Sequence, residues 1–363
     1  MLILLILNMM KERTVLIFGY PLAIQHLGGL VWIKKVVNYL DQSGKFCVKK
    51  ISNRRESHFY RLPFISDIRA LIRGIFSNPD IAMLDTYGEA AIWMWILLRL
   101  FCPRTKIATV FHHYEPLSVR HKGCTPLSAK YYALLDLITK IMLRNSDKII
   151  TVSKSSMREL KALIEIKIDK KIAVVGCSCT GYFSAEPSSP KDIDFLCIGR
   201  IEKFSEIENI WKEIRKKKPG SKFVMAGRCS SNDITCLRRI GIDHHGIVSD
   251  MEKIDLYRRA KVFLFPSLFE GFGIAIGEAL SAKMIVIAWK IPAFEERFPC
   301  QSNANLRLIN VGDKEIFVKN ALEAINDYDR SDSSKISTEN FGITQTWDEV
   351  GKNVVNAFET TLT

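Results

Sequence analysis

The chain alternates short apolar runs with longer segments in which apolar residues recur every three or four positions. This alternation predicts βαβ units on parallel sheets. In the first half we expect strands at 14–19, 81–85, 107–111, 148–152 and 172–175, and helices at 30–40, 90–101, 127–144 and 155–163. In the second half we expect strands at 194–198, 222–226, 262–265 and 285–288, and helices at 206–217, 253–259 and 274–282.

Between the two halves the periodicity stops, in the segment CSCTGYFSAEPSSPKD at residues 177–192. Glycine, proline and serine accumulate there, which is typical of a linker. A length of 363 residues also favours two domains over one. We therefore expect an α/β protein with one parallel-sheet domain at residues 1–180 and another from residue 190 onward. Ligands of such domains bind at the carboxyl ends of the strands, in a cleft.

The charge is distributed unevenly along the chain. The net charge is +13, but residues 1–180 carry +14 and residues 181–363 carry −1. So one-sided a field attracts an anionic partner, which could be nucleic acid, an anionic membrane face or a phosphorylated substrate. A lysine-rich surface without such a partner is the alternative. No nucleic-acid-binding signature accompanies the charge, so we expect no nucleic acid partner.

The nine cysteines include no C-x-x-C pair and no cluster with zinc spacing. This pattern indicates reduced thiols in a cytoplasmic protein without a metal site. No stretch reaches the roughly 18 apolar residues of a membrane-spanning helix. The opening MLILLILNMM is either an extension ahead of the first strand or a short apolar hook that rests on a bilayer surface.

Candidate functional residues are most concentrated in residues 260–297, AKVFLFPSLFEGFGIAIGEALSAKMIVIAWKIPAFEER. An apolar strand ends at Pro266, and a loop with Gly271 and Gly273 leads into a predicted helix. Glycines let the backbone approach a ligand, and the free N–H groups of a helix start suit phosphate or sugar oxygens. Glu270 on the loop and Glu278 in the helix can face the same cleft. A carboxylate can accept hydrogen bonds from two sugar hydroxyls.

The string PSLFEGFGIAIGEALSAK, residues 266–283, resembles the donor-site motif of the family 4 retaining glycosyltransferases, a pair of glutamates separated by seven residues. These enzymes have the GT-B fold, two Rossmann-like domains whose parallel sheets face each other across a cleft. The resemblance implies that Glu278 binds the nucleotide ribose and Glu270 the donor sugar. It also implies that the backbone amides of Phe272, Gly273 and Ile274 meet the sugar and the diphosphate. Transfer would proceed with retention, from a UDP- or GDP-linked sugar, without a metal or other cofactor.

Weaker marks of the same family occur elsewhere. Gly28 and Gly29, in LGGL, resemble the glycine loop that approaches the donor phosphate. The segment TVFHHY resembles the place where the family has an active-site histidine, for which we favour His112 over His113. Residues 346–350 resemble the start of the final helix, which in this fold packs back on the first domain. The resemblance therefore divides the chain into 1–180, a donor domain at 190–342 and a terminal helical segment at 343–363.

The expected phosphate-binding residues depart from the family pattern. Arg200 follows a strand and suits the diphosphate, because a guanidinium group fits phosphate oxygens. The family usually adds a lysine five residues later, where this chain has Ser205, and Lys203 is the alternative cation. A GT-B partner or scaffold protein without activity therefore stays open. So does a related GT-B enzyme, such as a sugar-nucleotide epimerase or a phosphorylase.

Basic residues surround two apolar-aromatic segments in the acceptor-side half. One is HFYRLPFISDIRALIRGIF at residues 58–76, and the other precedes Tyr131 and Tyr132. The cations around them are Arg54, Arg55, Arg61, Arg69, Arg73, Arg120, Lys122 and Lys130. Such surfaces suit a bilayer interface or a lipid-phosphate acceptor. We expect a peripheral enzyme on the cytoplasmic membrane face that acts on a lipid-linked saccharide or glycolipid in polysaccharide biosynthesis. The alternative is that these apolar residues form core helices with solvated arginines.

Overall fold

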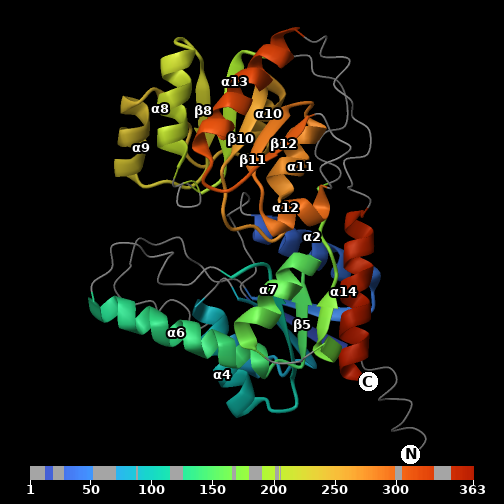
Figure 1. The fold of residues 1–363 in the computed structure, drawn as a ribbon. Coiled ribbons are helices and arrows are strands. Elements are labelled where there is room, and N and C mark those ends of the chain that lie inside the picture. The colour runs from blue at the N-terminus through green and yellow to red at the C-terminus, as the bar shows by residue number, and fades with distance from the viewer. Residues whose placement is uncertain are drawn as a thin grey trace, which may run out of the picture. The chain divides into compact units, whose positions relative to one another are not determined.

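The computed structural model describes residues 13–18, 28–51, 71–86, 89–114, 126–165, 169–179, 190–200, 204, 206–298, 305–330 and 345–363. The chain divides into two compact units, whose elements are labelled in Figure 1. The first unit contains strand β1, Gly29–Cys177 and Trp347–Thr363, and the second contains Gly28 and Ser178–Thr346. Each unit is built on its own sheet.

The first unit contains a six-stranded sheet in the order β2-β1-β3-β4-β5-β6, and every neighbouring pair is parallel. Its strands are β1 (Arg13–Phe18), β2 (Phe46–Ile51), β3 (Ile81–Asp85), β4 (Lys106–Phe111), β5 (Lys148–Thr151) and β6 (Ile172–Val174). Its helices are α2 (Gly28–Ser43), α4 (Glu89–Phe101), α6 (Pro126–Arg144), α7 (Lys154–Ile164) and α14 (Trp347–Leu362), with a 3-10 turn at Asp169–Lys171. The central strands are buried on both faces, which explains their continuous apolar runs.

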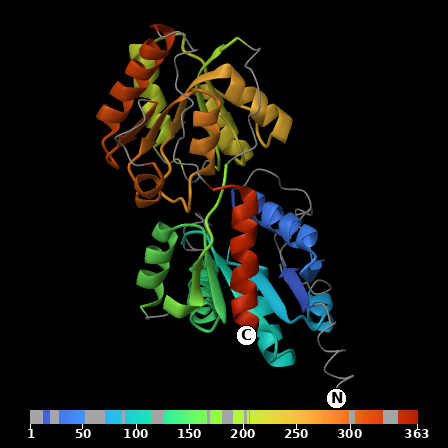
Figure 2. The ribbon, with the colours of Figure 1, turned by 90° about the vertical axis from the view of Figure 1, so that its right-hand side faces the viewer.

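Helix α14 belongs to the first unit although it follows the whole second unit in sequence. Asn353 Nδ2 donates a hydrogen bond to the Val175 carbonyl at 3.1 Å, and the Phe358 and Phe46 rings meet edge to face with centroids 5.9 Å apart. A Cβ on Gly351 would lie 2.2 Å from the Tyr39 ring, so glycine permits the close approach of α14 to α2. Figure 2 shows α14 alongside the other elements of this unit.

The second unit contains a six-stranded parallel sheet in the order β12-β11-β10-β7-β8-β9. Its strands are β7 (Ile193–Ile198), β8 (Phe223–Ala226), β9 (Ile242–His244), β10 (Ala260–Phe265), β11 (Ile285–Trp289) and β12 (Leu306–Ile309). Its helices are α8 (Ile207–Lys217), α9 (Ser231–Arg239), α10 (Asp250–Arg259), α11 (Ile274–Ser281), α12 (Pro292–Arg297) and α13 (Lys314–Arg330). One apolar core that includes Trp211, Phe263 and Trp289 runs through the unit.

Each sheet has a point at which the strand order reverses. In the first sheet this point lies between β1 and β3, and in the second it lies between β7 and β10. Ligands of open parallel sheets bind outside the carboxyl ends of the strands at such a point. The segments that follow β1, β3, β7 and β10 are therefore the places where the topology favours a site.

The structure confirms the α/β fold class and every strand and helix that the sequence predicted, with ends that agree within about three residues. The sequence did not predict β2, β9, α9, α12, β12 and α13. The three missed strands lie at or beside sheet edges, and β9 and β12 are only three and four residues long. Within the described residues, no helix is long and apolar enough to cross a bilayer.

Candidate functional site

The loop between β10 and α11 is shaped by Gly273, the residue that caps α11. Its φ of +83° lies in the left-handed region, and a Cβ there would come within 2.8 Å of the Phe294 ring. Both conditions require glycine. Helix α11 then starts at Ile274, and a helix start of this kind presents backbone N–H groups to acceptor atoms. The Ile276 N–H donates to the Gly273 carbonyl at 3.1 Å, so the amides of Ile274 and Ala275 are the ones that face outward from this turn in a regular helix. The predicted glycine loop and helix start are present, beside the point where the second sheet reverses its strand order.

Glu278 is buried in α11, with 2% of its surface exposed. Lys253 Nζ donates to Glu278 Oε1 at 2.7 Å, and the Tyr257 hydroxyl donates to Oε2 at 3.0 Å. Both partners come from α10, one helical turn apart. Burial, followed by the charge of Glu278, raises the pKa of Tyr257 well above its usual value, so its hydroxyl remains a donor. Both carboxylate oxygens are therefore held in a fixed direction.

Glu270 lies on the loop, four residues before the start of α11, and is only half-buried. Its Oε1 accepts a hydrogen bond from the buried Ser267 hydroxyl at 3.0 Å. The two predicted glutamates thus differ in setting, because one is a loop acid near solvent and the other is enclosed. This difference suits a role at a reacting group for Glu270 and a role in binding for Glu278.

Arg297, at the end of α12, contacts the same loop and was not predicted. Its guanidinium carbon lies 3.4 Å from the centre of the Phe272 ring, and its Nη2 donates to Cys179 Sγ at 3.0 Å. Burial raises the pKa of the Cys179 thiol to about 11, so Cys179 is protonated at neutral pH. The Arg297 cation is therefore packed beneath a residue whose backbone amide was predicted to meet the sugar.

Arg200 follows Gly199 at the carboxyl end of β7, on the other side of the reversal point from β10. The Gly199 N–H donates to the Ala226 carbonyl at 2.9 Å, which ties this end of β7 to β8. Arg200 is buried, with 8% of its surface exposed. Lys203 and Ser205 lie outside the described residues. Arg200, the predicted diphosphate ligand, therefore follows β7, and the neighbouring strand β10 leads into the loop that contains Gly273.

In the first unit, the structure brings together two residues that the sequence identified separately. A Cβ on Gly29 would lie 3.3 Å from His112 Nε2, and this nitrogen is 3.9 Å from Asp85 Oδ2. The Trp32 ring meets the imidazole edge to face, with centroids 5.6 Å apart. Gly28 is the first residue of α2. These residues follow or adjoin the carboxyl ends of β3 and β4, near the reversal point of the first sheet.

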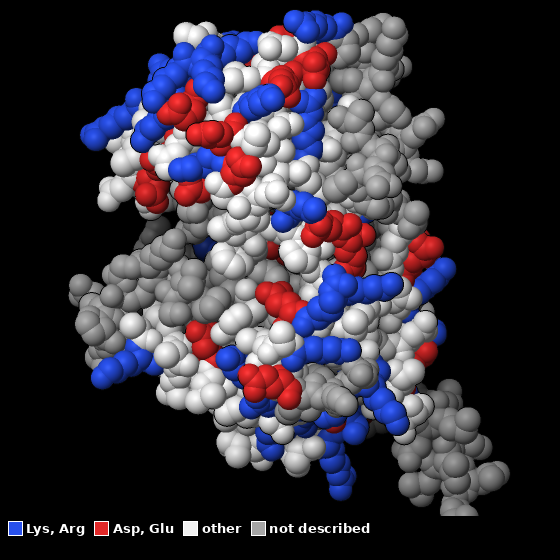
Figure 3. Space-filling view, in the orientation of Figure 1, with Lys and Arg blue, Asp and Glu red and all other residues white. Residues whose placement is uncertain are grey.

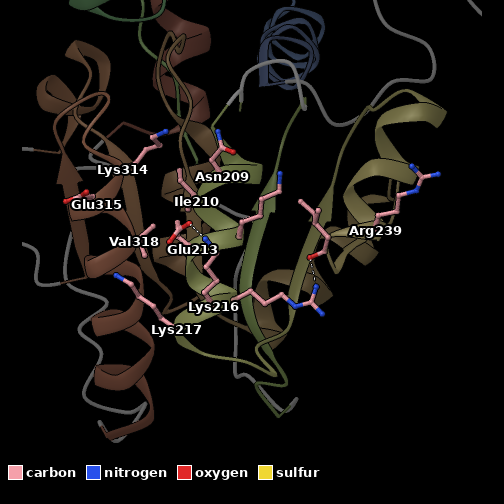
Figure 4. A pocket seen from close by; sticks show the side chains of 12 residues that line it. Asn209, Ile210, Glu213, Lys216, Lys217, Arg239, Lys314, Glu315 and Val318 are labelled. Atoms are coloured by element: carbon pink, nitrogen blue, oxygen red, sulfur yellow. Dashed lines mark hydrogen bonds and ion pairs between the residues drawn. The ribbon is translucent and has the colours of Figure 1, made fainter.

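A groove of about 1120 Å³ lies elsewhere in the second unit, between α8, α9 and α13 (Figure 4). Its lining includes six cations, which are Lys212, Arg215, Lys216, Lys217, Arg239 and Lys314. Basic side chains gather over α8 and α9 on the face shown in Figure 3, mixed with acidic ones. No residue that the sequence analysis singled out lines this groove. Lys216 pairs with Glu213 at 2.7 Å, and Arg215 donates to the Ile240 carbonyl at 2.8 Å, so part of this charge is compensated locally.

The two six-stranded parallel sheets with alternating helices define the GT-B fold. Residues 192–327, within the second unit, match the family model described as glycosyl transferases group 1. No curated protein matches the chain in sequence.

Solved structures share this fold at low sequence identity. Sucrose-phosphate synthase from Thermosynechococcus elongatus is 14% identical, with a TM-score of 0.72 over 96% of this chain and 99% of that one. HepE of Anabaena, solved with UDP and glucose, is 13% identical, with a TM-score of 0.64 over 96% and 100% of the chains. A putative UDP-N-acetylglucosamine 2-epimerase from Listeria monocytogenes is 12% identical, with a TM-score of 0.57 over 96% of both chains.

Four residues near the predicted ones were missed by the sequence analysis: Asp85, Lys253, Tyr257 and Arg297. Asp85 could have been found, because it ends a predicted strand beside the strand that precedes His112. Lys253, Leu256 and Tyr257 form the buried face of α10, so a lysine within an apolar three-four spacing was the available signal. Arg297 had no such signal, because α12 itself was not predicted.

Proposed function

We propose that the chain is a glycosyltransferase that moves a sugar from a nucleoside diphosphate sugar to an acceptor hydroxyl, with retention and without a metal or other cofactor. The observation that carries the proposal is the way in which neighbouring side chains orient the carboxylate of Glu278. A buried carboxylate with both oxygens oriented stands in the helix whose amino end is an amide-rich glycine bend. The match of residues 192–327 to group 1 glycosyl transferases supports this proposal.

In the proposed reaction the second unit holds the donor. Glu278 accepts hydrogen bonds from the ribose hydroxyls, and Glu270 contacts the sugar. Amides at Phe272, Gly273 and Ile274 meet the sugar and the diphosphate. Arg200 neutralises the departing diphosphate together with the positive end of α11, because guanidinium groups and helix amino ends both stabilise phosphate charge. HepE, which shares the fold, was solved with UDP and glucose, and this favours a UDP-linked donor.

The first unit supplies the acceptor side. His112 is the catalytic residue proposed in this unit, and Asp85 and Gly29 set the position of its ring. The glycine leaves room for the imidazole, and the Asp85 carboxylate lies 3.9 Å from Nε2.

We propose an acceptor at the cytoplasmic face of an anionic membrane, such as a lipid-linked saccharide or glycolipid. Helix α6 supports this, because Leu134, Leu137 and Ile141 share one face and are 53%, 53% and 38% exposed. Lys130 and Lys140 lie on the same helix. Exposed apolar residues flanked by lysines suit the surface of a bilayer with anionic lipids. Of the cations that the sequence analysis grouped around the apolar-aromatic segments, Arg73 and Lys130 are described, and both are exposed.

A thermal-shift panel of UDP, GDP, ADP and their sugars tests the proposal. A nucleotide at about 100 times its Kd should raise the free energy of unfolding by about 2.7 kcal/mol. Glu278→Ala should abolish the shift given by the nucleotide that stabilises the wild type. The absence of any shift with the wild type would overturn the proposal.

Product analysis separates the other GT-B activities. A transferase releases nucleoside diphosphate in proportion to glycosylated acceptor. An epimerase interconverts two nucleotide sugars and releases no nucleotide, and the shared fold with an epimerase makes this control necessary. A partner protein without activity would bind nucleotide without turnover.

A further inference from the structure

We propose that Lys253 is a positioning residue for nucleotide recognition, which acts through Glu278 to make the site select a ribose with its 2′,3′-diol over a 2′-deoxyribose. This inference rests on the proposed function and adds a residue outside the recognised motif. Lys253 stands in α10, 25 positions before Glu278 in sequence. Its Nζ lies 2.7 Å from Glu278 Oε1, and both side chains are almost fully enclosed.

Lys253 places a positive charge beside the buried carboxylate of Glu278. Lys253 and Glu278 have 5% and 2% of their surfaces exposed, so neither charge is solvated by bulk water. Removing an isolated charge from water is costly, and a hydrogen-bonded partner of opposite sign offsets that cost. Tyr257 adds a neutral hydrogen bond at 3.0 Å but contributes no charge. Lys253 is therefore the cation that compensates Glu278 in this contact.

The geometry leaves acceptor capacity on both carboxylate oxygens. An ionised carboxylate offers about four acceptor positions, and the contacts from Lys253 and Tyr257 occupy one on each oxygen. One further position on each oxygen matches the two adjacent hydroxyls of a ribose, which are both donors. Without Lys253, only the Tyr257 hydrogen bond would orient the carboxylate, which could then rotate, and at least one of these positions would be lost.

The experiment compares ribose with deoxyribose on the full chain. Affinities for UDP and dUDP, GDP and dGDP, and ADP and dADP are measured by calorimetry, and the base that binds best is used for the variants. The wild type should prefer the ribose form by about tenfold to a hundredfold, the effect of one hydrogen bond to a charged group. Lys253→Met should reduce this preference below about threefold and leave the affinity for the deoxy form within about twofold.

Lys191→Met is the matched control for the loss of a partly buried lysine. Lys191 Nζ donates to the Ala260 and Ala282 carbonyls at 2.7 and 3.2 Å in the same unit, and these contacts do not involve Glu278. This variant should keep the full ribose preference. A preference that falls equally in Lys191→Met and Lys253→Met would show a general loss of structure and overturn the proposed role.

A double variant covers the case in which Lys253→Met leaves Glu278 uncompensated and does not fold. Lys253→Met combined with Glu278→Gln contains no buried charge in this contact, and its shape is conserved. If Lys253 acts through Glu278, the double variant should match Glu278→Gln alone in ribose preference. A further loss in the double variant would mean that Lys253 contacts the nucleotide itself, which contradicts a positioning role.

The remaining outcomes separate this inference from the function on which it rests. If the wild type binds none of the six nucleotides, the proposed function fails. If the wild type and Lys253→Met bind with the same ribose preference, only the role of Lys253 fails.

Discussion

The guanidinium carbon of Arg297 lies 3.4 Å from the centre of the Phe272 ring, so a helix that the sequence did not predict is coupled to the loop that carries the donor motif. Both residues belong to the second unit, and Arg297 is buried. A desolvated cation on an aromatic face contributes up to about 2 kcal/mol. The contact therefore packs α12 against the segment between Glu270 and Gly273.

Replacing Arg297 should weaken nucleotide binding because the loop amides lose their support. Arg297→Met should raise the Kd for UDP by about threefold to thirtyfold, as expected for a cation–π contact of about 0.6–2 kcal/mol. Arg297→Lys should also weaken binding, because lysine has no planar group to stack. Calorimetry on the folded variants measures both. As a control, Arg307→Met removes a less buried arginine that pairs with Asp327 and should leave the Kd for UDP unchanged. An unchanged Kd for Arg297→Met would disprove the coupling between α12 and the loop.

A substitution of Gly273 should destabilise the second unit more than its backbone conformation alone requires. At Gly312 φ is +90° and a Cβ would meet nothing within 4 Å, so Gly312→Ala measures the backbone cost, about 1–2 kcal/mol. Gly273→Ala adds a contact of 2.8 Å with the Phe294 ring and should cost about 1–3 kcal/mol more. Urea unfolding measures the difference. Equal losses at both positions would mean that the Phe294 ring moves aside freely.

Two adjacent buried histidines can be distinguished by activity. His112→Asn should lower turnover about a hundredfold, the usual size of a positioned catalytic group, and leave the Kd for UDP within about twofold. His113→Asn should have a smaller effect on turnover, because His112 is the histidine that lies against Gly29, Asp85 and Trp32. Release of UDP from the active donor sugar gives the rate. The reverse order of effects would assign the role to His113.

The exposed face of α6 should control membrane association. Leu137→Glu should reduce flotation with anionic liposomes severalfold, because it places a negative charge on an apolar face that is opposed by anionic lipid. Ile247→Glu alters a residue of the second unit that is 61% exposed, and should leave flotation unchanged. Binding that persists in Leu137→Glu, or that does not depend on salt in the wild type, would count against a membrane surface at α6.

The sequence predicted the parts of the candidate site that are contiguous in the chain. Glu270, Gly273 and Glu278 lie within nine residues, and their loop-to-helix placement followed from local glycine and proline signals. Lys253 and Arg297 reach the same region only because α10 and α12 pack against the neighbouring elements. Local propensity carries no information about which side chain will meet Glu278 across two helices. The fold class was predictable because it depends on local signals: each central strand is a continuous apolar run that can be recognised without knowing its neighbours.

The elements missed at the sheet edges have a common physical cause. Strand β2 contains Lys49 and Lys50, and its burial is limited to its ends. Strand β9 has only three residues. An edge strand is stabilised by pairing with a neighbour rather than by burial on both faces, so its composition need not be apolar. The parallel pairing of Phe46 with Arg13 and of Phe223 with Ile242 supplies that stabilisation and is visible only in the folded chain.

The position of α14 affects the order in which the two units can be completed. Val350, Val354 and Phe358 complete the core of the first unit, yet a ribosome adds them after the whole of Ser178–Thr346. All of the second unit thus precedes, in sequence, the helix that completes the sheet of the first unit. A released chain that ends before Trp347 should accordingly resist protease in the later unit and remain cleavable in the earlier one.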